Sequence, residues 1–192
     1  MCVQRNLTRA SRMSQLFPDA AIESDQAKGT ICIRAADASD VESLSIYFTG
    51  LSTTTRNKRF MGARADVAIV AAECVARASH PDHFTLLAEL RQEGQGMIIG
   101  ETLYVYDAVA RQGEFAISVA DVFQRRGLGL QMMAAMEMRA SGLGHETIAA
   151  ETARANAEMR GLAKKAGFAD TGLGDWQSVH LAKGLSRQSS SR

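Results

Sequence analysis

Residues 124–129 read "QRRGLG", and this short stretch governs how the surrounding chain is interpreted. It follows a strand-like segment, "GEFAISVAD" (113–121), and opens a helical pattern over 128–141. The N-terminus of a helix exposes unpaired backbone N–H groups and the positive end of the helix dipole. The two glycines let a phosphate approach those groups closely, and Arg125 and Arg126 add positive charge. The stretch therefore predicts an anion-binding site.

The Gly-Leu-Gly part of this stretch recurs at 142–144 and at 172–174. The first recurrence follows a helical pattern, where glycine supplies a left-handed C-terminal cap. The second lies between two short strand-like segments, where glycines form a hairpin turn. Two common phosphate motifs fail: a dinucleotide fingerprint would need a glycine in place of Met132, and no P-loop run follows 113–121. Only the copy at 127–129 is therefore expected to contact a ligand.

The composition is that of one globular domain. Of the 192 residues, 46% are apolar and 22% are charged, and the formal net charge is only +1. This balance gives no electrostatic reason to expect nucleic-acid or membrane binding, and no run of 18 apolar residues predicts a membrane span. Three scattered cysteines, Cys2, Cys32 and Cys74, argue against a disulfide framework and predict a reducing, cytoplasmic location.

Hydrophobic periodicity predicts a mixed α/β chain. We expect strands over 30–36, 82–90, 96–107, 113–121, 146–153, 168–172 and 176–182, and helices over 37–50, 52–60, 65–78, 128–141 and 156–167. The helix between the strands 113–121 and 146–153 makes a crossover, so these strands are predicted to be parallel neighbours or near neighbours. The 128–141 helix is apolar around most of its circumference and is expected to pack on more than one side.

The two ends of the chain differ from its middle. Residues 29–184 are predicted to form the domain. We expect a loose N-terminal arm at 1–28, in part disordered, and a disordered polar tail at 185–192. The single tryptophan, Trp176, is expected in the core.

Two longer segments resemble a known superfamily. The stretch 124–129 resembles Q/R-x-x-G-x-G/A, the pyrophosphate signature of the GNAT N-acetyltransferases, and "NAEMRGLAKKAGF" (156–168) resembles that family's N-x-x-M/A-x-x-L-x-x-K-x-G-F segment. "LSTTTRNKRF" (51–60) and "GEFAISV" (113–119) are similar to a Leu-Ser…Arg-Phe helix and a Glu-Phe-Ala strand of the Pat-like protein lysine acetyltransferases. The resemblance covers about 30–183. It implies the GNAT fold: a mixed sheet of about six to seven strands, about four to five flanking helices, and a splayed parallel strand pair at the acetyl-CoA site.

The resemblance also implies an acetyl-CoA site. The residues assigned to it are Ile117, Ser118, Val119, Gln124, Arg125, Arg126, Gly127, Leu128, Gly129 and Asn156. The backbone of 124–129 would hold the pyrophosphate, and the backbone of 117–119 would lie beside the pantetheine arm. Asn156 would contact the CoA arm, with capping of its own helix as the structural alternative. One departure is Ala163, which stands where many relatives carry a tyrosine as general acid.

The implied reaction is direct attack of a primary amine, such as a protein lysine, on acetyl-CoA in a ternary complex. The resemblance assigns Glu114 as the general base, with Glu101 and Glu151 in reserve because both lie in strands that could line the same cleft. Two alternatives stay open: an acetyltransferase for a small amine or antibiotic, and a non-catalytic acyl-CoA-binding module. The sequence leaves the acceptor and the formation of a homodimer undecided.

No metal is predicted. His80 and His83 in "HPDH" are close in sequence, but no third ligand lies nearby and Pro81 prevents a helical pair. His145 and His180 have no partner that can be identified from the sequence.

Overall fold

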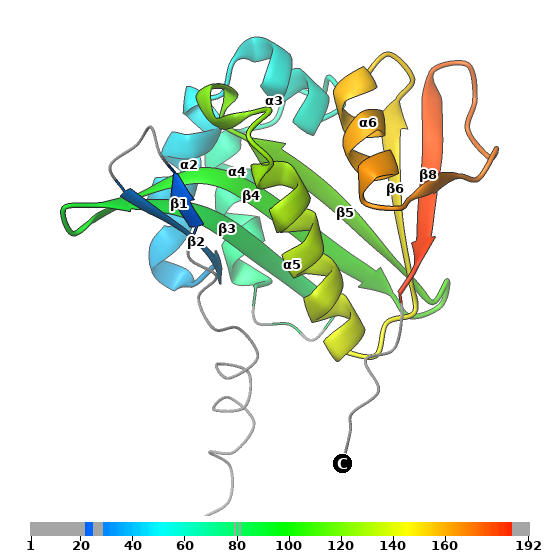
Figure 1. Ribbon diagram of the computed structural model, residues 1–192, viewed down its shortest axis with the longest axis horizontal. Helices are drawn as coiled ribbons and strands as arrows, with labels where there is room; N and C mark the ends of the chain where they lie inside the picture. The colour runs from blue at the N-terminus through cyan, green and yellow to red at the C-terminus, as the bar shows by residue number, and fades with distance from the viewer. Residues whose placement is uncertain (1–21, 25–28, 79, 81, 186–192) are drawn as a thin grey trace, which may run out of the picture.

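The computed structural model describes residues 22–24, 29–78, 80 and 82–185. The rest of the predicted arm, and the tail from residue 186, lie outside the described residues. The fold is built on one sheet of eight strands in the order β1-β2-β3-β4-β5-β6-β8-β7 (Figure 1). The strands are β1 (Ile22–Ser24), β2 (Gly29–Ala35), β3 (His83–Gln92), β4 (Gln95–Asp107), β5 (Gln112–Val119), β6 (Thr147–Ala153), β7 (Ala169–Asp170) and β8 (Ser178–Gly184).

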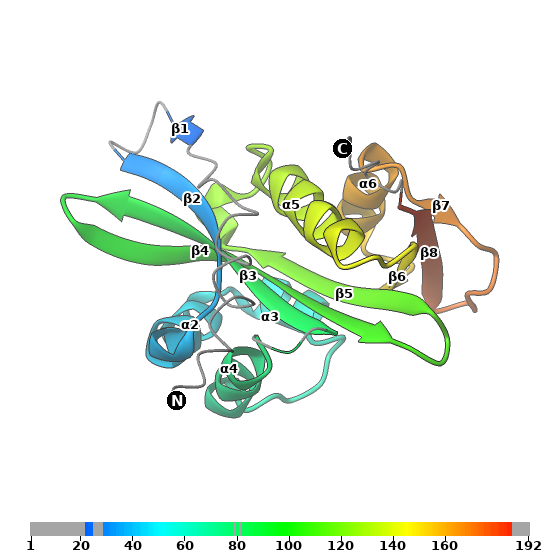
Figure 2. The same ribbon diagram turned by 90° about the horizontal axis from the view of Figure 1, so that it is seen from below.

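Helices cover both faces of this sheet, as Figure 2 shows: α2, α3 and α4 lie on one side, and α5 and α6 on the other. The helical segments are η1 (Ala38–Asp40), α2 (Val41–Gly50), α3 (Thr53–Arg59), α4 (Val67–Ala76), η2 (Asp121–Phe123), α5 (Leu128–Gly142) and α6 (Ala157–Lys165). The predicted mixed α/β fold is confirmed. The sheet has one strand more than the seven predicted, because the very short β1 lies in the segment expected to be an arm; the equally marginal β7 at the other edge was expected at 168–172.

The strand pairing places the functional region. All neighbouring strands are antiparallel except β5 and β6, which are parallel as the predicted crossover requires. Their ladder contains only the pairs Gly113↔Ile148 and Glu114↔Ala149. Beyond these residues the two strands diverge, and Figure 1 shows a V that is open at their C-terminal ends.

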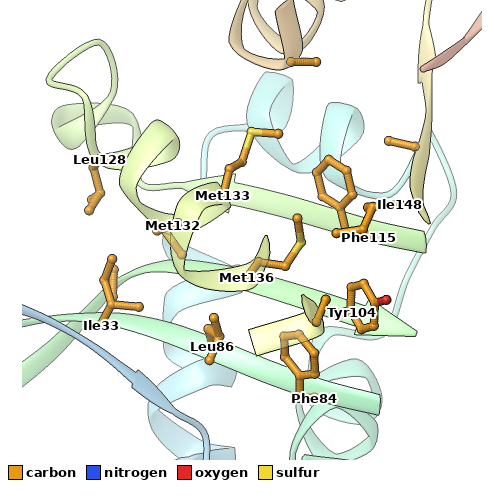
Figure 3. Close-up of a cluster of buried hydrophobic side chains, with 14 of the residues drawn as sticks. Ile33, Phe84, Leu86, Tyr104, Phe115, Leu128, Met132, Met133, Met136 and Ile148 are labelled. Carbon is orange, nitrogen blue, oxygen red and sulfur yellow. The ribbon is translucent and has the colours of Figure 1, made fainter. Parts of the chain in front are cut away.

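The core has one layer on each side of the sheet. Figure 3 shows the larger layer, where strand residues such as Phe84 and Phe115 meet the buried α5 side chains Met132, Met133 and Met136. The smaller layer lies between the sheet and α2 and α4, around the fully buried Leu44, Phe48 and Leu87. These three methionines thus fill the core, as polarizable and adaptable side chains do elsewhere.

One packing prediction was confirmed and another was wrong. The helix α5 packs on the sheet and on α6, hence on more than one side, and its outer side carries the partly exposed Leu130 (38%) and Met138 (49%). Trp176, expected in the core, is 81% exposed, because it lies in the loop between β7 and β8, two residues before β8 begins. Its apolar character predicted burial, whereas its position in the topology decided its exposure.

The three Gly-Leu-Gly copies behave as predicted in local structure. Gly144 has a φ of 86° just after the end of α5, and Gly172 has a φ of 72° in the turn between β7 and β8. The copy at 127–129 joins η2 to α5, at the C-terminal end of β5. It is therefore the one beside the open V.

Candidate functional site

The edge of β5 that faces the open V has no strand partner beyond Glu114. Ala120 N–H donates to Ile99 O of β4 at 2.9 Å, and β4 and β5 keep a regular antiparallel register. Because backbone groups alternate in direction along a strand, Ser118 turns its N–H and C=O toward β4, while Ile117 and Val119 turn theirs toward β6. The parallel ladder has already ended at Glu114, so Ile117 and Val119 face the gap.

The loop after β5 is shaped for an anion. Gly127 has a φ of 86° and Arg125 a φ of 59°, so two left-handed residues alternate within four positions. When left-handed and right-handed residues alternate, successive backbone N–H groups point into the same concave site, which can hold an anion. No side chain caps the N-terminus of α5, which leaves its first N–H groups available. A Cβ on Gly129 would lie 3.2 Å from Leu162 of α6, so glycine also permits α5 to pack closely there.

Side chains tie this loop to α3. Gln124 Nε2 donates to Val119 O at 3.0 Å and to Thr55 Oγ1 at 3.2 Å. The carboxylate of Asp121 accepts hydrogen bonds from Ser52 N–H (3.0 Å), Ser52 Oγ (2.7 Å) and Thr55 Oγ1 (2.7 Å). Burial alone would raise the pKa of Asp121, but these hydrogen bonds outweigh it and lower the pKa. The start of α3 is therefore fastened to the predicted pyrophosphate loop.

The opposite wall of the V is the start of α6. Asn156 caps this helix, accepting from Met159 N–H at 3.2 Å, and its Nδ2 donates to Thr152 Oγ1 at 3.2 Å. The capping role given as the structural alternative for Asn156 is thus confirmed, and its contact with CoA stays a prediction. In the first turn of α6, Glu158 meets Lys58 of α3 at 3.0 Å. The pair links α3 to α6, two helices that lie beside the wide end of the V (Figure 1).

One face of the sheet presents carboxylates beside the narrow end of the V. Phe115 of β5 and Ile148 of β6 belong to the core under α5, so the side chains of Glu114 and Glu151 point to the other face. At about 4.8 Å between strands and about 3.3 Å per residue, their Cα atoms lie about 8 Å apart. Glu114 is exposed, and Glu151 lies 3.6 Å from His180 of β8. Among the described residues, no helix covers this part of the face (Figure 2).

Beneath the same face lies a buried polar network. Arg59 donates to both carboxylate oxygens of Glu101, from Nε to Oε2 at 2.9 Å and from Nη2 to Oε1 at 2.8 Å. Ser118 Oγ donates to Glu101 Oε2 at 3.4 Å and shares a 2.9 Å hydrogen bond with Tyr47 OH. Burial opposes the charge of Arg59, yet the Glu101 carboxylate keeps its pKa above the usual value. The reserve assignment of Glu101 as a base was wrong, because its side chain is fully buried and paired with Arg59.

No tyrosine takes the place that Ala163 leaves. Ala163 is fully buried in the core. Tyr47 is committed to Ser118, and Tyr104 hydrogen-bonds His145 Nδ1 at 2.9 Å. Tyr106 stacks on the same imidazole with ring centroids 3.7 Å apart. All three tyrosines of the chain thus have structural contacts.

Metal and membrane features are few in the described part of the chain. His80 and His83 approach each other at 3.2 Å between their Nδ1 atoms, but the described residues contain no group of three metal-ligating side chains. Within the same ranges, no helix combines the length and apolar character that a bilayer crossing needs.

Several of these residues were not predicted from the sequence. Tyr47, Lys58, Arg59 and Asp121 received no functional role, and His180 received no partner. The basic last turn of α3 and the serine at its start were visible signals. The tertiary packing decides which of those charged side chains point into the protein, and no local sequence pattern indicates this choice.

Comparison with solved structures gives relatives of the whole fold. The GNAT domain of S. lividans PAT is 21% identical with a TM-score of 0.74, covering 88% of this chain and 99% of that one. YncA from Salmonella typhimurium, solved with its cofactor acetyl-CoA, is 19% identical with a TM-score of 0.64, covering 83% and 96%. Spermidine N-acetyltransferase from Vibrio cholerae, in complex with CoA and spermine, is 16% identical with a TM-score of 0.64, covering 82% and 96%.

The sequence itself was also compared with known proteins and families. No curated protein matches it significantly. The family model of the acetyltransferase (GNAT) domain matches residues 30–169, which include β2 to β6, the open V and the 124–129 loop. This chain therefore belongs to the GNAT acetyltransferase domain family.

Proposed function

We propose that this acetyltransferase moves an acetyl group from acetyl-CoA to a primary amine, with a protein lysine as the acceptor. The observation that carries the proposal is the edge of β5 at Ile117 and Val119, which has no strand partner on the β6 side. It lies between an uncapped helix N-terminus at one end and two carboxylates at the other. A donor that is anionic at one end and reactive at the other fits this arrangement.

The donor would bind along β5. The N–H groups of 124–129 would hold the pyrophosphate, with Arg125 and Arg126 nearby as additional charge. The backbone of Ile117 and Val119 would hydrogen-bond the extended arm as a missing strand would, and Asn156 lies at the other wall. The solved relatives from Salmonella typhimurium and Vibrio cholerae, which contain acetyl-CoA or CoA, support a ligand of this class.

The acceptor must lose a proton before it can attack. A lysine-type amine has a pKa of about 10.4, so freeing its lone pair costs about 4 kcal/mol at three pH units below that value. We assign this proton transfer to Glu114, directly or through water. The amine nitrogen then bonds to the acetyl carbon and the C–S bond breaks, so that CoA leaves as a thiolate; the nitrogen gives up its second proton, and the thiolate takes up a proton through water. The N–H groups of Ile117 and Val119 would stabilise the negative charge on the carbonyl oxygen.

The form of the acceptor face supports a protein substrate. Glu114 is exposed, and Glu151 and His180 are 46% and 43% exposed, so these groups lie on an open sheet face. An extended lysine side chain can reach such a surface, and the carboxylates favour its cationic form during encounter. A small polyamine would meet the same charges, and it is the competing acceptor in the test.

The test is amine-dependent release of CoA thiol from acetyl-CoA, with lysine-containing peptides and polyamines as separate arms. Glu114→Gln should lower turnover at neutral pH by about 100-fold, within the range for loss of a general base. Glu151→Gln, on the same face, is the matched control and should retain most of the activity. Full turnover by Glu114→Gln at all pH values would remove Glu114 from this role. Failure of every amine to release CoA would refute the proposed function.

A further inference from the structure

We infer that the buried network of Tyr47, Ser118, Glu101 and Arg59 positions the acetyl carbonyl of acetyl-CoA, by fixing the free edge of β5. The inference rests on the proposed function, because it assumes that acetyl-CoA lies along that edge. It assigns these four side chains as positioning residues. None of them needs to touch the reacting atoms.

The edge of β5 needs such support. A strand inside a sheet is held by hydrogen bonds on both sides, but Ile117 and Val119 have lost their β6 partners. This part of the backbone is still anchored by the β4 ladder, by the bond from Gln124 Nε2 to Val119 O, and by the side chain of Ser118, which lies between Ile117 and Val119. Donors that stabilise a developing charge are effective only if they are already in place.

Ser118 is anchored more firmly than a strand serine requires. Its side chain is buried, and its oxygen contacts both Tyr47 OH at 2.9 Å and Glu101 Oε2 at 3.4 Å. Glu101 is held in place, because Arg59 donates hydrogen bonds to both of its carboxylate oxygens and the Arg59 side chain is itself only 7% exposed. Ser118 is thus fixed from α2, α3 and β4 together.

Fold stability alone does not explain why this network is present. A buried ion pair contributes little net stability compared with apolar packing, because removing both charges from water is costly. The chain contains a second, partly buried ion pair on the same side of the sheet, Arg34 with Asp40 at 2.7 Å, in which the Arg34 side chain is 22% exposed. That pair has no contact with β5, so it provides a natural control.

The experiment compares the affinities for acetyl-CoA and CoA by calorimetry, which needs no acceptor. The two ligands differ only in the acetyl group, so their affinity ratio reports how well that group is held. We expect Ser118→Ala and Tyr47→Phe to reduce the preference for acetyl-CoA by about 5- to 10-fold, the effect of about one hydrogen bond, with CoA affinity nearly unchanged. Asp40→Asn should lower the melting temperature but leave the ratio at the wild-type value.

A spectroscopic measurement makes the test independent of stability. The ¹³C resonance of acetyl-CoA labelled at the carbonyl should shift on binding to the wild type, because hydrogen bonds polarise that group. The shift should shrink in Tyr47→Phe, which removes one oxygen and keeps the ring. Unchanged ratios and shifts in both variants would overturn the inference, as would a wild type that binds both ligands equally. A wild type that binds neither would refute the proposed function instead.

Discussion

The carboxylate of Asp121 should control the stability of α3. This helix has only seven residues, so it cannot persist without tertiary contacts. Asp121 supplies three of them, accepting from Ser52 N–H, Ser52 Oγ and Thr55 Oγ1. Because each hydrogen bond contributes about 1 kcal/mol net, Asp121→Ala should destabilise α3 by about 3 kcal/mol. Asp121→Asn keeps one acceptor oxygen and should lose about 1 kcal/mol, mainly through the Ser52 N–H.

Amide hydrogen exchange measures this effect locally. A loss of 1.4 kcal/mol corresponds to a tenfold change, so α3 amides should exchange about 100-fold faster in Asp121→Ala and about fivefold faster in Asp121→Asn. Asp107→Asn is the control, because Asp107 accepts from Val109 N–H and Ala110 N–H in a turn remote from α3.

The pH dependence has a definite sign. The pKa of Asp121 is lowered in the folded protein, so its contribution is complete above the unfolded pKa of about 4 and disappears as the pH falls through the folded value. The wild-type advantage over Asp121→Asn should therefore shrink as the pH falls below about 4 and vanish once the pH is below the folded pKa of Asp121. Equal α3 exchange in wild type and Asp121→Ala at pH 7 would show that Asp121 does not stabilise α3.

Two further predictions concern the loop and the far end of the sheet. Gly127→Ala and Gly144→Ala both place an alanine at a φ of 86° in open space, so each should lose about 1–2 kcal/mol of stability, measured by thermal unfolding. Only Gly127→Ala should also weaken acetyl-CoA binding in calorimetry; equal binding by the two variants would contradict the loop assignment. Burial lowers the pKa of His145, and Asp82 only partly offsets it. The unfolded chain therefore binds this proton more readily, so stability should fall as the pH drops below about 6.5. The fall in melting temperature between pH 7.5 and 5.5 should be smaller in His145→Gln; an equal fall would exclude His145 as its source.

The sequence predicted those features that depend on local pattern. The order of strands and helices follows from periodicity, and the parallel pairing of β5 and β6 follows from the single helix between them. The left-handed Gly144 after α5 and the cap at Asn156 follow from residue type at a helix end and at a helix start. These predictions succeeded because each one depends on a few neighbouring residues.

Other features depend on contacts that the sequence does not reveal. The sequence made both Glu101 and Glu114 candidate bases. In the structure Glu101 is buried and paired with Arg59, whereas Glu114 is exposed. Glu101 lies opposite Ser118 in the β4–β5 register. Its partner Arg59 belongs to α3, more than 40 positions earlier in the chain, so the pairing cannot be read from neighbouring residues. Only the packing of α3 against the sheet distinguishes the two carboxylates. The exposure of Trp176 has the same kind of cause, since the β7–β8 turn sets its position.

The central claim is that acetyl-CoA binds along the free edge of β5 and on the loop that starts α5. The most direct measurement is titration of isotopically labelled protein with acetyl-CoA, followed by amide NMR. We predict the largest shifts at the amides of Ile117, Val119 and 127–129, with the amides of 142–144 and 172–174 unchanged. Absence of binding at millimolar acetyl-CoA, or shifts confined to other parts of the sheet, would contradict the account.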